Sequence, residues 1–278
     1  MKELKEDCLS VFPLVNRPLI HCITNEITAE LLANGLLSIK ASPMMADAEE
    51  EMRDVSKKSD SVLLNLGHLS VSKQQAMLKT AYYCQELSKP FVIDLVGIGA
   101  TSVRKAFAEK IISYSPTVVK GNISEMRTFC GLSSQAKGVD SLAEDQEPQQ
   151  LLLLAQAMTN LGKKYPETIF LATGEIDLIS NKDGCWKLMN GVSNLGRFTG
   201  TGDLVGALIA GLLGDEVSPF VATLSGLTYF NSCGEVAQQL LQADEGLASF
   251  RLRVLDQLSL LWRKNDWILN LKGERICN

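Results

Sequence analysis

The sequence predicts an α/β fold, with a mostly parallel central sheet and helices on both of its faces. Short apolar runs alternate along the chain with longer amphipathic segments. The runs are apolar on both faces, as strands buried in a parallel sheet are. Polar residues follow the ends of several runs, which is where open α/β sheets bind their ligands. These patterns indicate repeated βαβ units with a site at the carboxyl ends of the strands.

Five apolar runs supply the expected parallel strands. Between them, residues 26–38 and 72–87 place apolar side chains at i, i+3 and i+4, which predicts amphipathic helices. The expected strands are residues 18–22, 61–66, 91–95, 117–120 and 168–172.

The pattern changes after Thr173. Residues 176–180 and 185–189 flank the sequence Asn-Lys-Asp-Gly, a β-hairpin signal, so the sheet should end in antiparallel strands. From Asp203 onward we expect mostly helix, over 220–242 and 249–267. The polar segment 133–149 should be a surface excursion rather than a domain linker.

Composition limits the classes of function. The chain has 278 residues, 46% of them hydrophobic and 21% charged, which suits one large α/β domain or two small ones. The net charge of -5 comes without a basic patch, so we expect no nucleic-acid partner. No apolar run reaches the roughly 18 residues of a membrane span. The charged N-terminus has no apolar signal core after it, so we expect a cytoplasmic protein.

Cysteine and histidine patterns argue against a zinc site. The seven cysteines occur singly, and the only histidines are His21 and His68. We expect free buried thiols and two structural histidines. The chain also lacks a nucleophile elbow, a Walker-type loop and a dinucleotide-binding glycine motif in its proper context.

The most informative motif is Phe-Thr-Gly-Thr-Gly-Asp at 198–203, which opens into an apolar stretch of helical length. A helix start presents unpaired N–H groups and the positive end of the helix dipole, and glycines let backbone approach an anion. Asp203 stands where a phosphate should dock. That placement makes sense if Asp203 takes a proton from a hydroxyl that attacks the phosphate, as in a small-molecule kinase. The alternative is that Asp203 only caps the helix.

Further candidates follow the expected strands. Asp94 ends one of them and precedes two glycines, so it could hold Mg²⁺ through water, or it could simply form a turn. Asn122 and Glu125 stand one helical turn apart, so they could face one ligand, form a capping box, or do both.

Three more residues have a functional and a structural interpretation. Lys120 could neutralise a phosphate, or it could be an ordinary solvated lysine. Thr173 begins a Thr-Gly-Glu turn whose hydroxyl and backbone groups could bind a nucleotide phosphate, or it could belong to an ordinary turn. Met45, next to Met44, could pack against a flat or sulfur-containing ligand, although methionines more often belong to the core.

Taken together, these segments resemble the hydroxyethylthiazole kinase family, a thiamine-pathway branch of the ribokinase-like superfamily. The resemblance runs from about Pro18 to about Gly214, and the order and spacing of the matches are specific. The matching stretches are 21–25, 33–37, 41–46, 64–67, 94–101, 120–125, 173–177 and 199–203.

The resemblance implies a single ribokinase-like domain over residues 1–278, built as a three-layer sandwich. It implies transfer of the ATP γ-phosphate to the hydroxyethyl group of 4-methyl-5-(2-hydroxyethyl)thiazole, with Mg²⁺. It also implies a homotrimer with active sites between subunits. By matching position, the residues that would contact the thiazole substrate are Met45, Gly200 and Asn25. Those that would contact ATP are Lys120 and Thr173. Mg²⁺ would be organised by Asp94 and Glu125, and the general base would be Asp203.

The chain departs from the family pattern at a few positions. Asp203 stands where the family usually has cysteine, and Lys120 replaces the usual arginine, which keeps the charge but loses the two-pronged geometry. Leu95 and Ile98 replace proline and alanine. Because ribokinase-like relatives generally use aspartate at position 203, a second interpretation is a pyridoxal or hydroxymethylpyrimidine kinase. A third is a non-catalytic ligand-binding protein that kept the fold.

Overall fold

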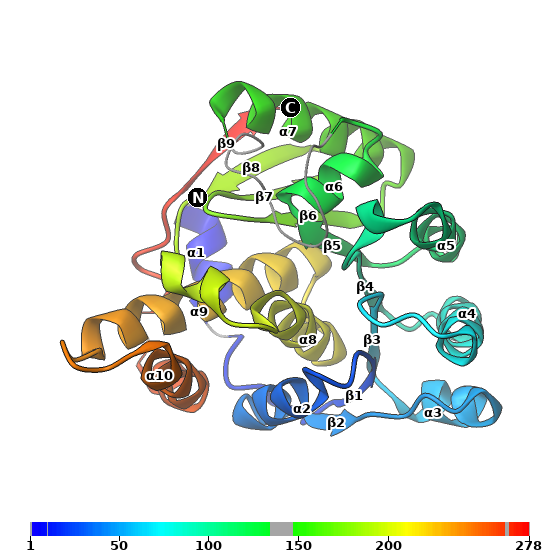
Figure 1. Cartoon of the computed structure of the whole chain (residues 1–278), viewed down its shortest axis with the longest axis horizontal. Coiled ribbons are helices and arrows are strands. Elements are labelled where there is room, and N and C mark those ends of the chain that lie inside the picture. The colour runs from blue at the N-terminus through cyan, green and yellow to red at the C-terminus, as the bar shows by residue number, and fades with distance from the viewer. Residues whose placement is uncertain (1, 10, 134–146, 265–266, 278) are drawn as a thin grey trace.

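The computed structural model describes residues 2–9, 11–133, 147–264 and 267–277. Its described strands form one nine-stranded sheet in the order β2-β1-β3-β4-β5-β6-β7-β8-β9 (Figure 1). Strands β1 to β6 pair with one another in parallel, whereas the pairs β6–β7, β7–β8 and β8–β9 are antiparallel, so the expected change of strand direction is confirmed. The strands are β1 (Leu19–Ile23), β2 (Ser42–Met44), β3 (Ser61–Asn65), β4 (Phe91–Asp94), β5 (Val118–Asn122), β6 (Ile169–Thr173), β7 (Asp177–Asn181), β8 (Gly184–Leu188) and β9 (Gly273–Cys277).

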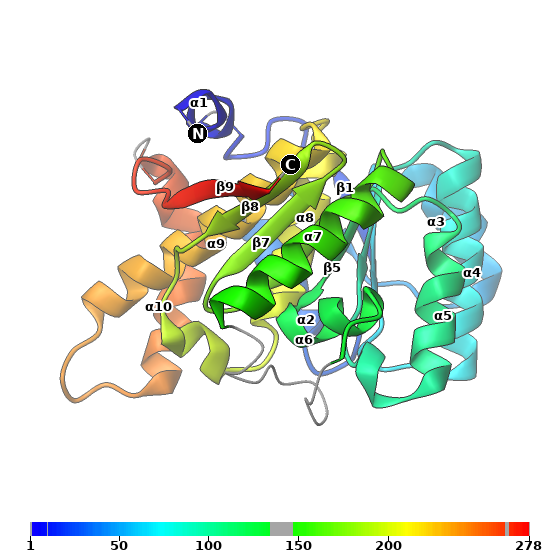
Figure 2. The ribbon, with the colours of Figure 1, turned by 90° about the horizontal axis from the view of Figure 1, so that it is seen from above.

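Helices cover both faces of the sheet, which confirms the three-layer α/β architecture (Figure 2). Residues of each strand alternate between two cores, one shared with each helical layer. One layer holds α3 (Met52–Lys58), α4 (Val71–Glu86), α5 (Ser102–Ile112), α6 (Ile123–Phe129) and α7 (Pro148–Lys164). The other holds α1 (Lys2–Leu9), α2 (Ala29–Ser38), α8 (Thr201–Gly214), α9 (Pro219–Leu240) and α10 (Leu247–Leu260).

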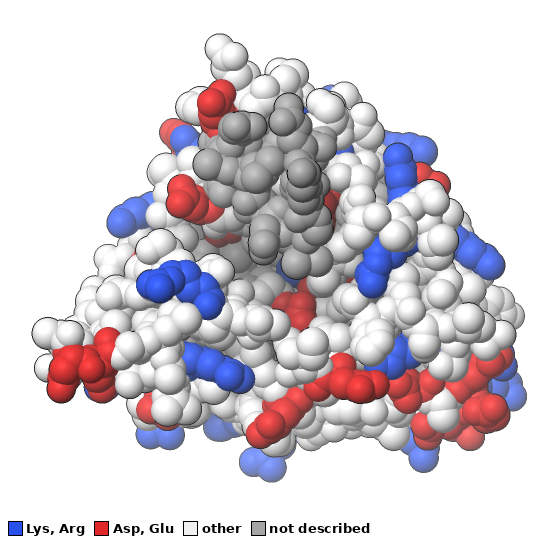
Figure 3. Space-filling view, in the orientation of Figure 1, with Lys and Arg blue, Asp and Glu red and all other residues white. Residues whose placement is uncertain are grey.

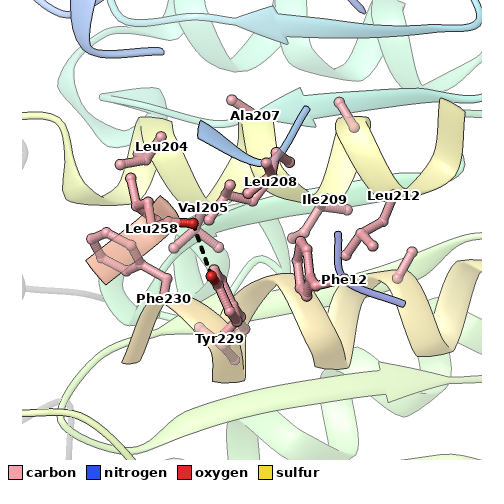
Figure 4. Close-up of a cluster of buried hydrophobic side chains, with 14 of the residues drawn as sticks. Phe12, Leu204, Val205, Ala207, Leu208, Ile209, Leu212, Tyr229, Phe230 and Leu258 are labelled. Carbon is pink, nitrogen blue, oxygen red and sulfur yellow. Dashed lines mark hydrogen bonds between the residues drawn. The ribbon is translucent and has the colours of Figure 1, made fainter. Parts of the chain in front are cut away.

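The second layer is built around α8 and α9, which are apolar over most of their surfaces. In Figure 4, α8 packs on α9, and Phe12 stacks on Tyr229 with ring centroids 4.2 Å apart. The buried Tyr229 hydroxyl donates to the carbonyl of Leu258 in α10 at 2.8 Å. This packing encloses α8 between α9 and the sheet. Within the described residues, no helix is both long and apolar enough to cross a membrane.

Several sequence-based boundaries need correction. The helix expected at 26–38 begins only at Ala29, and the one expected at 249–267 is α10, which ends at Leu260 before a 3₁₀ turn. The expectation of mostly helix after Asp203 missed β9, which pairs with β8 at the sheet edge. β2, which contains Pro43, was also missed, because a three-residue edge strand leaves almost no periodic signal. Of the excursion predicted at 133–149, residues 134–146 lie outside the described residues.

Candidate active site

The polar clusters expected at strand ends converge where β1, β3, β4, β5 and β6 end and α8 begins (Figure 1). Parallel strands bring their carboxyl ends to the same side of the sheet, so residues far apart in the chain become neighbours there. Figure 3 shows the surface of the molecule in the orientation of Figure 1, with acidic side chains in a hollow near the middle of this face.

Asp203 lies in the first turn of α8 and is 8% exposed. Its Oδ2 accepts hydrogen bonds from Asn25 Nδ2 at 2.9 Å and from Thr28 Oγ1 at 2.6 Å. Both donors come from the segment between β1 and α2. The cap of α8 is Gly200, which makes no side-chain cap bond, so Asp203 is not the helix cap. Thr28 was not predicted as a site residue, although its position three residues after Asn25 in the sequence indicates that the two could lie close together.

Gly200 allows α8 to begin where it does. Its φ of 97° is in the left-handed region that favours glycine. A Cβ at this position would lie 2.6 Å from Leu31 Cδ2 and 2.8 Å from Thr28 Cγ2. The loop before α8 therefore packs directly on α2 and on Thr28, which donates a hydrogen bond to Asp203.

Asp94 and Lys120 form a buried ion pair, with Asp94 Oδ2 and Lys120 Nζ 2.8 Å apart. Lys120 is 2% exposed, so its interpretation as a solvated lysine is wrong. Burial raises the pKa of the Asp94 carboxyl to about 6; the Lys120 ammonium opposes this rise, and the charge of Asp203 adds to it. Asp94 Oδ1 is buried and has no hydrogen-bond partner among the described residues.

Glu125 closes a capping box with Asn122, and this confirms the structural interpretation of the pair. Glu125 Oε2 accepts from the Asn122 N–H at 2.7 Å, and Asn122 Oδ1 accepts from the Glu125 N–H at 2.8 Å. Glu125 Oε1 accepts from the N–H of Gly97, in the loop after β4, at 2.8 Å. Burial and the charge of Asp94 raise the pKa of Glu125 to about 7, against the two backbone hydrogen bonds. The carboxyl is thus both a cap and a neighbour of Asp94.

Thr173 and Met45 lie at the borders of this cluster. Thr173 ends β6 beside Asn122 of β5, and its hydroxyl donates to the carbonyl of Gly121 at 3.4 Å. Met45 follows edge strand β2 and is 38% exposed, so the core interpretation is wrong for this methionine. His21 is buried with Nε2 2.8 Å from the carbonyl of Ala46, which agrees with its structural interpretation.

A fourth buried carboxyl, Asp177, was not predicted from the sequence, and it supports the Thr173 turn. Asp177 accepts from the Gly174 N–H through Oδ1 and from Asn231 Nδ2 of α9 through Oδ2, each at 2.9 Å. Burial raises its pKa to about 7, against these two hydrogen bonds. Its only sequence signal is an acidic residue at the start of a strand that is otherwise apolar.

Comparison with known proteins gives a consistent result. The family model described as hydroxyethylthiazole kinase family matches residues 14–264. The chain is 47% identical to a hydroxyethylthiazole kinase of Enterococcus faecalis, over 95% of this chain and 96% of that protein. It is 48% identical to one of Lacticaseibacillus casei, over 96% and 95%. A solved hydroxyethylthiazole kinase from Pyrococcus horikoshii OT3 matches with a TM-score of 0.83 at 31% identity, covering 99% of this chain and 100% of that one. The chain therefore belongs to the hydroxyethylthiazole kinase family.

Proposed function

We propose that this protein transfers the γ-phosphate of ATP to the hydroxyethyl group of 4-methyl-5-(2-hydroxyethyl)thiazole, using Mg²⁺, in thiamine biosynthesis or salvage. One observation carries the proposal. A carboxylate fixed by two hydrogen bonds, Asp203, stands in the first turn of a long helix, next to a buried Asp94–Lys120 ion pair. Phosphoryl transfer requires mainly such positioning and charge compensation.

Asp203 is the general base of this reaction. Its Oδ2 is occupied by Asn25 and Thr28, and among the described residues Oδ1 has no hydrogen-bond partner. Oδ1 can therefore accept the proton of the substrate hydroxyl as its oxygen attacks the γ-phosphorus. The N–H groups at the start of α8, with residues 199–202, stabilise charge that develops on the transferred group.

The residues present fit a hydrated Mg²⁺. Asp94 Oδ1 is a buried acceptor without a partner among the described residues, and Glu125 lies near it. No group of three His, Cys, Asp or Glu side chains that could hold a metal occurs in the part of the chain described, so the ion would be held largely through water, as Mg²⁺ prefers. Bound there, Mg²⁺ would offset the charge of the phosphates.

The remaining site residues divide between the two substrates. Lys120, in the middle of β5, and Thr173, at the end of β6, contact ATP. Asn25, Met45 and Gly200 line the thiazole pocket. Met45 lies away from the carboxylate cluster, at the sheet edge, which is compatible with pockets formed between the subunits of a homotrimer. The single-domain organisation, the cytoplasmic location and the trimer all stay predictions.

The alternative substrate is pyridoxal or hydroxymethylpyrimidine. Its support is Asp203, in place of the family's usual cysteine. Family membership over residues 14–264 favours the thiazole alcohol instead.

Magnesium-dependent ADP release, with the three alcohols assayed side by side, tests the proposal. We expect selective turnover of the thiazole alcohol and none after Mg²⁺ is removed with EDTA. Preference for pyridoxal or the pyrimidine would keep the mechanism but change the substrate. Binding of ATP without turnover of any alcohol would instead favour the non-catalytic interpretation.

A further inference from the structure

Three polar side chains form a row across adjacent strands beneath α8. Thr24 follows β1, Asn65 ends β3 and Asp94 ends β4. Asn65 and Asp94 are paired in register, so they point to the same face of the sheet. That face is the one under α8, because Leu63, two residues before Asn65, lies 3.2 Å from the position of a Cβ at Gly206.

Each member of this polar row is buried and incompletely bonded. Thr24 is 8% exposed, and Asn65 and Asp94 are 0% exposed. Among the described residues, Thr24 Oγ1, Asn65 Nδ2 and Asp94 Oδ1 have no hydrogen-bond partner. Buried polar atoms in native proteins are nearly always bonded, so a row of three indicates a place where ligand atoms supply the missing bonds.

The Asn65 amide has a defined orientation. Its Oδ1 accepts from the N–H of Gly67 at 2.7 Å, so the amide cannot turn over without breaking this bond. A Cβ at Gly67 would lie 2.8 Å from Asn65 Oδ1 and 3.3 Å from Asn25 Nδ2. Asn65 thus lies between Asn25, which holds Asp203, and Asp94, which pairs with Lys120.

The chemistry of the amide selects its ligand. Nδ2 carries two N–H donors and needs an acceptor oxygen. A metal-bound water donates its protons, so it suits Asp94 Oδ1 and not Asn65. A phosphoryl oxygen is an acceptor that can lie between the start of α8 and the strand ends. We infer that Asn65 is a further residue of the phosphoryl-transfer site and donates through Nδ2 to an oxygen of the transferred phosphoryl group. This inference rests on the proposed kinase function.

The variant Asn65→Asp tests the donor directly. Aspartate keeps the shape and an oxygen for the Gly67 N–H, and it removes the N–H donors. We expect kcat with the thiazole alcohol to fall about 100-fold or more, as when a preorganised donor is lost elsewhere, while its KM changes less than about threefold. Asn65→Ala, which removes the donor without adding charge, should show the same loss of kcat.

A binding measurement supplies a readout besides turnover. Aluminium fluoride with ADP and Mg²⁺ mimics the transferring phosphoryl group, and calorimetry compares its affinity with that of ADP alone. We expect wild type to gain affinity from the fluoride, and both Asn65 variants to lose that gain but keep their ADP affinity. Ser61→Ala, on the same strand, removes a buried hydrogen bond to the Ala210 carbonyl and is the matched structural control. It should keep the gain.

The outcomes separate this inference from the proposed function. Wild type that turns over no alcohol would overturn the proposed function, and the inference with it. Active wild type, with Asn65→Ala retaining both kcat and the fluoride-dependent gain, would overturn only the inference. If Asn65→Asp loses kcat and the fluoride-dependent gain but Asn65→Ala keeps both, the effect comes from the added charge, and the inference about the Asn65 donor is also overturned. Should Asn65→Asp fail to fold, the affinities of Asn65→Ala decide.

Discussion

At the residue scale, the hydrogen-bond donors to the Asp203 side chain lie outside its own helix, α8. A capping aspartate bonds to N–H groups of its own first turn. Among the described residues, Asp203 instead accepts its hydrogen bonds through one oxygen, from Asn25 and Thr28. The other carboxylate oxygen has no partner there, as the proposed role of base requires.

Replacing Asp203 with asparagine should remove most of the turnover. An asparagine oxygen can still accept from Asn25 and Thr28, so the loop geometry is kept while the proton acceptor is lost. We expect kcat to fall about 100-fold to 10,000-fold, the range for loss of a general base, with ATP affinity nearly unchanged. Steady-state kinetics and ATP calorimetry measure the two effects. Turnover like that of wild type would rule out the assignment of Asp203 as base.

Lys120 stabilises the fold as well as the site. Lys120→Met would leave the Asp94 carboxylate buried without its counter-ion, and breaking such a pair costs about 3–5 kcal/mol. We expect a lower free energy of unfolding in urea at pH 8, and a higher pKa for Asp94. Lys120→Arg, which keeps the charge, is the control and should recover most of the stability. Equal stability of wild type and Lys120→Met would contradict the buried pair.

At the element scale, the start of α8 depends on contact with α2. Gly200 has a φ of 97°, and a Cβ there would collide with Leu31 and Thr28. The close packing of α8, which carries Asp203, against α2 and Thr28 therefore depends on one glycine.

Gly200→Ala should impair both stability and turnover. The left-handed backbone costs a residue with a Cβ about 1–2 kcal/mol, and relief of the collision displaces Thr28 from Asp203. We expect reduced stability in urea together with a lower kcat. Gly196→Ala is the matched control, because it has no positive φ and no atom within 4 Å of the added Cβ. Similar behaviour of the two variants would refute this account.

The contact between β7 and α9 should make stability depend on pH. The pKa of Asp177 is about 7 in the folded protein, against 3.8 ordinarily. From about pH 4 to about pH 7 the folded protein binds more protons than the unfolded chain, so the stability from this group falls as pH rises. Above pH 7 it is lost completely.

Comparison with Asp177→Asn isolates this titration. The stability of wild type relative to the variant should fall between pH 5 and pH 8 by on the order of 1 kcal/mol or more. Urea unfolding at the two pH values measures the difference. Parallel stability curves for the two proteins would show that Asp177 does not titrate in this range.

At the scale of the whole molecule, two strongly exposed apolar side chains lie near the site. Ile27, in the segment after β1, is 81% exposed, and Val71, at the start of α4, is 73% exposed. Lys73 of α4 donates to the carbonyl of Thr24 at 3.0 Å, so the two segments are neighbours. We predict that these two side chains lie in a subunit contact, where burial would remove them from water.

Sedimentation should therefore give a mass of about three times 30.4 kDa, the trimer that family resemblance implies. Ile27→Glu should weaken the assembly and lower activity with it. Val15→Glu is the control, because Val15 is 80% exposed but lies at the far end of α8, where its N–H bonds to Asp215. A monomeric wild type would contradict the prediction.

Much of this protein follows from sequence by itself. Periodic apolar runs identify the buried strands, and the glycine-rich start of α8 predicts an anion-binding site at that end of the helix. The grouping of Asp94, at the end of β4, with Glu125, in the helix after β5, is predictable because a parallel sheet brings its strand ends to one side. Short or terminal edge strands such as β2 and β9 were not, because their pairing depends on partners distant in sequence.

Only the tertiary structure decided how these residues act. Lys120 is an ordinary lysine in the sequence, and it becomes a counter-ion because Asp94 ends the neighbouring strand in register. From the sequence, Asp203 could equally be a helix cap or a proton acceptor; the hydrogen bonds from Asn25 and Thr28 exclude the cap. Asn65 becomes a candidate site residue only in the structure, where the Gly67 N–H fixes its amide and its Nδ2 has no acceptor among the described residues. Local sequence determines secondary structure through periodicity, whereas burial and hydrogen-bond partners depend on which distant segments the sheet brings together.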